Sequence, residues 1–124
     1  MQIVDGLVAL PRDSRTQEQL EWVADEILEA DGEATIWIAT PGSAEHERAL
    51  AERMAAAIAV EYQAVIDAAG AARAKDGAGR RRTLARLRRT LQAIRARDYF
   101  PPPERELAQQ AVAELAALVE EPVR

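Results

Sequence analysis

The sequence predicts an α+β fold that is predominantly helical, in which a small β-sheet with one helix precedes an antiparallel three-helix bundle. Ala supplies 27 of the 60 apolar residues and only five residues are aromatic, a composition that suits closely packed helices. Two short stretches rich in β-branched residues, near 2–10 and 34–40, are typical of strands. From residue 42 onward the apolar residues recur at helical spacing. We expect one domain over 1–124, with a small α/β part (1–41) and a helical bundle (42–124).

The first part of the chain predicts strand, helix and strand. Residues 2–10 favour one strand, or two short strands that turn at Asp5-Gly6. Thr16 and Gln19 have the spacing of a capping box, so a helix is expected from about 17 to 30. Asp31-Gly32 suits a left-handed cap at its end. Residues 34–39 then predict a buried strand.

Three helices are expected in the remainder. Ser43 is a good N-cap for a helix over 44–69, which Gly70 should end. The glycines of 70–79 indicate a mobile connection before a helix over 80–97. Prolines at 101–103 form a stiff corner before a last helix over 104–120. The interior of the bundle is predicted to consist of Leu50, Met54, Ile58, Leu84, Leu87, Leu91, Ile94, Leu115 and Leu118.

Positive charge is concentrated in one segment. Residues 71–97 hold ten basic residues against Asp76, a balance of +9, while the rest of the chain carries six basic and 20 acidic residues, a balance of −14. Guanidinium groups on one helix can bind an oxyanion or nucleic-acid phosphates. The candidates for such a site are Arg80, Arg81, Arg82, Arg86, Arg88 and Arg89. The favoured alternative is that this basic helix is mainly paired with acidic neighbours in the same chain.

Several classes of site are excluded or disfavoured. The chain has no Cys, which excludes disulfides, thiolate catalysis and Cys-ligated zinc. The single histidine, His46, is better explained as a surface residue than as a metal ligand, so neither a metal nor a cofactor is expected. No catalytic constellation is recognisable, which predicts a protein that is not an enzyme. No apolar run approaches the length of a membrane span and no signal peptide is evident, so we expect a cytoplasmic protein without a membrane partner.

The order of short motifs resembles the N-terminal domain of the chromate-resistance protein ChrB family. The matching pieces are the Asp5–Pro11 segment DGLVALP, the Asp31–Ala34 segment DGEA, Tyr62 on the long helix, the basic stretch Arg80–Arg89 and the Ala93–Pro101 segment AIRARDYFP. Val8 stands where the family usually has an aromatic residue. The family also usually has a strand and a helix before the first motif and a second domain afterwards, and this chain shows neither.

The resemblance implies a non-enzymatic regulatory or accessory binding module linked to chromate resistance and to control of a chromate transporter gene. Two alternatives remain: a nucleic-acid-binding module that uses the Arg-rich helix 80–97, or a pure protein-interaction and assembly module. A sheet this small is marginal alone, so we also expect a homo-oligomer. Trp22 and Trp37 are the interface candidates, since Trp22 lies off the inner stripe of its helix; the alternative is that Trp22 rests on the bundle of its own subunit.

Overall fold

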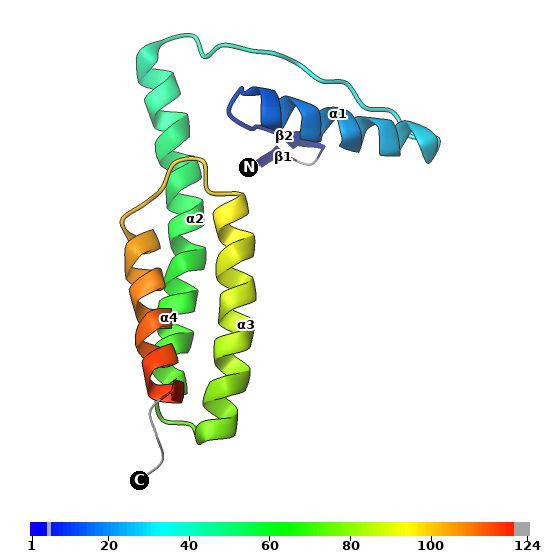
Figure 1. Cartoon of the computed structure of the whole chain (residues 1–124). Helices are drawn as coiled ribbons and strands as arrows, with labels where there is room; N and C mark the ends of the chain where they lie inside the picture. Colours follow the sequence, from blue (N-terminus) through cyan, green and yellow to red (C-terminus); the bar gives the residue numbers. More distant parts are fainter. Residues whose placement is uncertain (5, 121–124) are drawn as a thin grey trace. The chain divides into compact units, whose positions relative to one another are not determined.

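The computed structural model describes residues 1–4 and 6–120, and the chain divides into two compact units, 1–47 and 48–124. Most of the described residues are helical, as predicted (Figure 1). The elements in order are β1 (Gln2–Val4), β2 (Leu7–Val8), α1 (Ser14–Glu29), α2 (Ala44–Ala72), α3 (Gly77–Ala96) and α4 (Glu104–Glu120). Within the described ranges, no helix is both long enough and apolar enough to cross a bilayer.

A short hairpin opens the N-terminal unit. β1 and β2 pair antiparallel, with Gln2 opposite Val8. Beyond them, the backbone N–H of Ala9 donates to the carbonyl of Met1 at 2.8 Å. Gly6 has φ 84°, a value that favours glycine, and therefore allows the chain to reverse here. The predicted turn also includes Asp5, which lies outside the described residues.

The small sheet predicted from strands near 2–10 and 34–40 is not formed in the described part of the chain, because residues 34–40 are not a strand. The expectation that this segment is buried is also wrong, since Trp37 is 82% exposed and Ile38 is 57% exposed. β-branched and aromatic residues favour a strand when there is a neighbouring strand and a packed surface to receive them. The β1–β2 hairpin does not pair with this segment, so the local preference has no effect.

Interactions at both ends of α1 fix its limits. The helix begins earlier than predicted, and its capping box joins Asp13 to Thr16 rather than Thr16 to Gln19. The Asp13 carboxylate accepts from the Thr16 backbone N–H at 2.8 Å, and the Thr16 hydroxyl accepts from the Asp13 backbone N–H at 3.1 Å. At the other end Asp31 adopts φ 64°, and the Gly32 N–H donates to the carbonyl of Ile27 at 2.8 Å. This is a Schellman motif, so the predicted left-handed cap is confirmed, with Asp31 as its left-handed residue.

α2 begins as predicted and continues further than predicted. Ser43 accepts a hydrogen bond from the backbone N–H of His46 at 3.1 Å, which confirms it as the N-cap. Gly70 does not end the helix, which runs on to Ala72. A single glycine inside a helix costs about 1 kcal/mol relative to Ala, and packing of the flanking turns outweighs that cost. Ala69 and Ala72, on either side of Gly70, are both buried.

α3 begins earlier than predicted because Asp76 caps it. The Asp76 carboxylate accepts from the Gly79 backbone N–H at 2.7 Å. A Cβ atom on Gly79 would lie 3.0 Å from that carboxylate oxygen, so glycine allows the close approach. The predicted mobile connection over 70–79 is therefore wrong: helix occupies most of it and the turn between α2 and α3 is short. The bounds predicted for α4 are confirmed.

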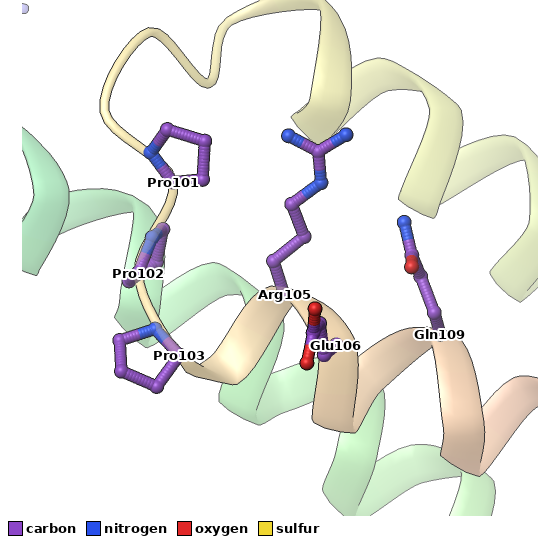
Figure 2. Close-up of a pocket in the computed structure, with 6 residues that line it drawn as sticks. All are labelled: Pro101, Pro102, Pro103, Arg105, Glu106 and Gln109. Atoms are coloured by element: carbon purple, nitrogen blue, oxygen red, sulfur yellow. The ribbon is translucent and has the colours of Figure 1, made fainter.

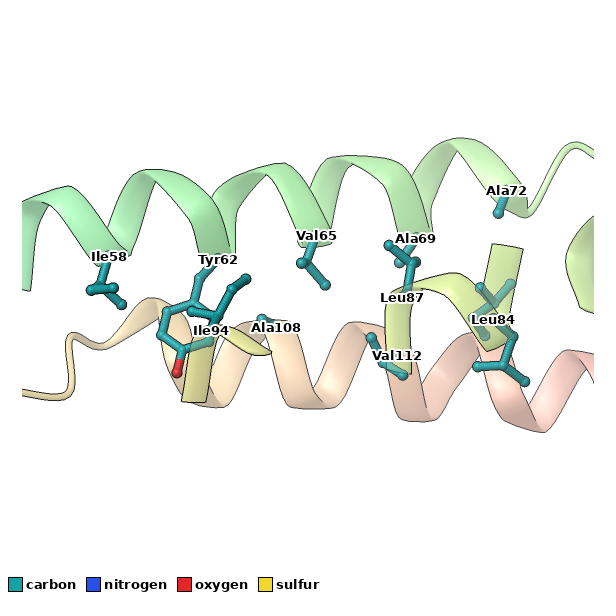
Figure 3. Close-up of a cluster of buried hydrophobic side chains, with 11 residues drawn as sticks. Ile58, Tyr62, Val65, Ala69, Ala72, Leu84, Leu87, Ile94, Ala108 and Val112 are labelled. Carbon is teal, nitrogen blue, oxygen red and sulfur yellow. The ribbon is translucent and has the colours of Figure 1, made fainter. Parts of the chain in front are cut away.

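The core of the bundle lies between α2, α3 and α4, which alternate in direction (Figure 1). Tyr62, Val65, Ile94 and Leu115 are the largest fully buried side chains. Figure 3 shows Tyr62 and Ile94 together near one end of the cluster and Ala72 and Leu84 at the other. Of the nine residues predicted inside, six are buried, whereas the structure leaves three half-buried: Leu50, Leu91 and Leu118.

Candidate functional site

The arginines of α3 form the most highly charged surface of the bundle. This helix carries seven Arg and no acidic residue over Gly77–Ala96. Its buried positions, among them Leu84, Leu87 and Ile94, all lie on the side that faces α2 and α4. Helical spacing therefore directs most of the arginines outward, and five of the six predicted site residues are exposed: Arg81, Arg82, Arg86, Arg88 and Arg89.

The exposed arginines lie in two rows. Arg81 and Arg88 are seven residues apart, and Arg95 continues their row by another seven. Arg82, Arg86 and Arg89 make the second row. We call these six residues the arginine face. Because Ala85 and Gln92 lie between the rows, the charges are spread over a convex surface and do not converge on one point.

Arg80 differs from the other candidates because its side chain turns back onto the chain. Its Nη2 donates to the carbonyl of Arg73 at 2.6 Å. Its Nε is buried and has no hydrogen-bond partner among the described residues. Lys75 lies nearby and donates from Nζ to the hydroxyl of the buried Thr83 at 3.1 Å. Arg80 thus belongs to the α2–α3 turn and not to the arginine face.

The expectation that the basic helix is mainly paired with acidic neighbours is wrong for the described residues. The ion pairs found there join Arg73 to Glu114, Arg97 to Glu61 and Arg105 to Asp98. None of the three involves the arginine face. α2 and α4 carry the acidic side chains that were expected to pair with it, but packing through the apolar core leaves the outer side of α3 to solvent.

A second polar cluster lies at the other end of α3 and was not predicted as a site. The hydroxyl of Tyr62 on α2 donates to Asp98 Oδ2 at 2.7 Å. Arg105 Nη1 on α4 lies 3.8 Å from the same oxygen, and the Asp98 side chain is fully buried. Asp98 Oδ1 is buried without a hydrogen-bond partner in the described part of the chain. Side chains from α2, from the α3–α4 corner and from α4 therefore meet at one carboxylate.

This environment changes the acidity of Tyr62. Burial, and then the hydrogen bond to Asp98, raise the pKa of Tyr62 to about 12. The phenol is therefore a hydrogen-bond donor throughout the physiological pH range. A neutral phenol that donates to a buried carboxylate holds that carboxylate in place.

Next to the cluster, Arg97 and Glu61 form a two-pronged ion pair. Arg97 donates from Nη1 and Nη2 to the two Glu61 carboxylate oxygens at 2.9 and 2.8 Å. The hydrogen bonds from Arg97 lower the pKa of Glu61. Both side chains are about half exposed, so solvent weakens the pair.

The corner between α3 and α4 borders a shallow hollow of about 460 Å³ (Figure 2). Pro101, Pro102 and Pro103 form one side of it, and the first turns of α4 form the other with Arg105, Glu106 and Gln109. Figure 2 shows Arg105 extending from α4 toward the ribbon of α3. The lining offers one cation, one carboxylate and one amide, which is not the lining of an enclosed apolar ligand pocket.

The two interface candidates both lie in the N-terminal unit and are open to solvent. Trp22 on α1 is 61% exposed, and Trp37 in the segment after α1 is 82% exposed. Val23 and Leu28, on the predicted inner stripe of the same helix, are also exposed, so exposure does not distinguish the two sides of α1. Elsewhere, no group of three or more His, Asp or Glu among the described residues could hold a metal ion.

The sequence contains one signal for the contact between Tyr62 and Asp98. Tyr62 is the only aromatic residue in the apolar stripe of its helix, and a buried tyrosine hydroxyl needs a hydrogen-bond partner. The partner lies 36 residues further on, and helical spacing within one segment cannot identify it.

Comparison of the chain with protein-family models, with curated proteins and with solved structures gives no match.

Proposed function

We propose that this chain is a non-enzymatic, cytoplasmic regulatory or accessory binding module of the ChrB N-terminal type, and that its arginine face binds an extended polyanion such as duplex nucleic acid. The single observation that carries the proposal is that six arginines on α3 are exposed and make no ion pair with the described residues. The order of motifs that resembles that family, which includes Tyr62 and the Ala93–Pro101 segment, supports the assignment.

The form of the arginine face favours an extended anion over a single small oxyanion. A chromate or sulfate ion needs several donors that converge within hydrogen-bond distance. The two rows diverge over a convex helix, with Ala85 and Gln92 between them. Phosphates repeated along a duplex match spread charges better, and the two residues between the rows carry no negative charge that would repel them.

The remainder of the chain limits the affinity. Its −14 balance repels phosphates at long range, although salt screens this repulsion beyond about 8 Å at physiological ionic strength. We therefore expect dissociation constants in the non-specific range of about 10⁻⁴ to 10⁻⁶ M at about 150 mM salt, with a steep salt dependence.

A fluorescence-anisotropy titration with duplex DNA over a range of salt concentrations tests the proposal. Replacing Arg82, Arg86 and Arg89 by Gln should weaken binding. The slope of log affinity against log salt concentration should become shallower by about 2.7, because each lost phosphate contact contributes about 0.9. Replacing Arg12, Arg15 and Arg48 by Gln removes the same charge from positions outside α3 and should lower the slope far less. Equal effects of the two triple variants, or no binding at about 50 mM salt, would refute the proposal. Sodium chromate and sodium sulfate at millimolar concentration should weaken DNA binding no more than sodium chloride of the same ionic strength does.

We also propose that the chain self-associates, with Trp22 and Trp37 as contacts. Two exposed indole side chains in a unit whose regular elements are one hairpin and one helix support this proposal. Trp22→Ala should then raise the dissociation constant of the oligomer in equilibrium sedimentation, rather than lower only the stability of each subunit.

A further inference from the structure

α2 has a second apolar side, opposite the one that faces the core. Val60 is 71% exposed, and Ala56 and Ala64 lie next to it on the same side of the helix. We call this surface the Val60 face and define it by Arg53, Ala56, Val60, Ala64 and Asp67. Its two charges are Arg53 and Asp67, at the two ends of the face.

The charges of the Val60 face are arranged symmetrically. Arg53 and Asp67 each lie seven residues from Val60, one before it and one after it. Seven residues are close to two helical turns, about 10 Å, so the two charges and Val60 lie along one line on the helix. Ala56 and Ala64 are likewise four residues to either side of Val60. A two-fold axis through Val60 would therefore place unlike charges opposite each other.

We infer that the Val60 face binds a second copy of this chain, with the two α2 helices antiparallel and the two Val60 side chains on the axis. Each Arg53 then faces the partner's Asp67, so one charge pattern supplies two ion pairs. Each Ala56 faces the partner's Ala64, and small side chains let the helices approach closely. A parallel arrangement would oppose Arg53 to Arg53, so the charges select the antiparallel one.

The hydrogen bonds of the monomer leave these groups available. Gln63 Nε2 donates to Asp67 Oδ1 at 3.0 Å, which orients the carboxylate and leaves Oδ2 for a partner. Arg53 takes part in none of the ion pairs found among the described residues. The proposed contact with a second copy would cover the exposed Val60 and would give Arg53 a carboxylate partner.

This inference rests on the self-association proposed above and adds a second contact surface to the two tryptophans. A charge-swap series tests it by equilibrium sedimentation of the whole chain, from micromolar to about 300 µM. Arg53→Asp opposes two carboxylates and Asp67→Arg opposes two guanidinium groups. Each single change should raise the dimer dissociation constant at least about tenfold, and the double variant should restore it to within about threefold.

Matched variants distinguish this contact from a general effect of charge and from a loss of folding. Arg48→Asp makes the same charge change at an exposed position of α2 away from the Val60 face and should leave the dimer intact. Far-UV circular dichroism of each variant checks that the helices are retained.

Three outcomes would contradict the inference. If Trp22→Ala dissociates the dimer and Arg53→Asp leaves it unchanged, the Val60 contact is wrong while self-association stands. A single species of 13.6 kDa at all concentrations would overturn both. Failure of the double variant to restore the dimer would also overturn the Val60 contact.

Discussion

The two units of the chain obtain their helices in different ways. Among the residues of unit 1–47 whose burial the structure describes (1–2 and 6–47), Thr16 is buried but no large apolar side chain is. In unit 48–124, a cluster of buried side chains joins α2, α3 and α4. α1 is nevertheless a regular helix, because a capping box fixes its start and a Schellman motif fixes its end. α1 is therefore ordered by local hydrogen bonds at its two ends, whereas α2, α3 and α4 are ordered by the burial of apolar side chains.

The apolar stripe of α1 shows the consequence of this difference. Val23, Ile27 and Leu28 have helical spacing, yet they are 50%, 38% and 55% exposed. An amphipathic pattern predicts that a helix forms and which side is apolar, but not whether another element covers that side. In the bundle the same kind of pattern leads to full burial at Val65 and Leu115.

The largest effect is expected from a cavity in the bundle core. Ile94 is 2% exposed and lies beside Tyr62 in Figure 3. Ile94→Ala should lower the free energy of unfolding by about 2–5 kcal/mol, because both buried apolar surface and packing contacts are lost. Urea denaturation followed by circular dichroism measures the change. Leu107→Ala on α4 is the control, since Leu107 is 53% exposed and a change within about 0.5 kcal/mol is expected. If the two variants lost equal free energy of unfolding, the prediction that Ile94 belongs to the core and Leu107 does not would be wrong.

A smaller effect is expected from the polar contact that closes the bundle at its corner. Tyr62→Phe removes the donor to Asp98 Oδ2 and leaves a buried carboxylate with Arg105 as its nearest cation, 3.8 Å away. The expected loss is about 1–3 kcal/mol in the free energy of unfolding. Tyr99→Phe is the matched control, because Tyr99 makes no hydrogen bond through its hydroxyl among the described residues, and it should change stability little.

The raised pKa of Tyr62 adds a pH dependence to that prediction. The pKa rises from 10.0 to about 12 on folding, so between these values the folded chain keeps a proton that the unfolded chain releases. The stabilisation is fully present below about pH 10 and is lost as the pH rises toward 12. Wild type should therefore lose more stability than Tyr62→Phe between about pH 9 and about pH 11. An equal loss in both proteins would refute the assignment.

Much of the bundle could be predicted from the sequence, because its signals are local. Ser43 as an N-cap, the limits of α4 and the buried positions Met54, Ile58 and Leu87 all follow from spacing and capping chemistry. The start of α3 was missed because Gly77 and Gly79 suggested a loop, whereas the Asp76 cap needs a small residue at position 79. The rule that glycine-rich segments form loops fails here, because the hydrogen bond from the Gly79 N–H to Asp76 starts the helix.

The failures of prediction concern interactions between distant parts of the chain. Residues 34–40 have the composition of a strand, but no strand among the described residues pairs with them. The arginines were expected to meet acidic side chains, but the core of the bundle fixes the orientation of α3 and directs them outward. The contact of Asp98 with Tyr62 was not predicted, because it depends on how α2 and α4 pack.

The smallest effect should be confined to the N-terminal unit. The hydrogen bond from the Thr16 backbone N–H lowers the pKa of Asp13, so the cap stabilises α1 above the ordinary value of 3.8 and is lost as the pH falls through the lowered pKa. Asp13→Ala should speed amide hydrogen exchange in α1 severalfold, because the cap is removed. Asp13→Asn keeps an acceptor without the charge, so it should protect α1 and abolish the acid-dependent loss of protection. If α1 is held by its caps, exchange in α2, α3 and α4 should not change in either variant. Faster exchange across the bundle in Asp13→Ala would show instead that the two units are energetically coupled, and local capping alone would not explain α1.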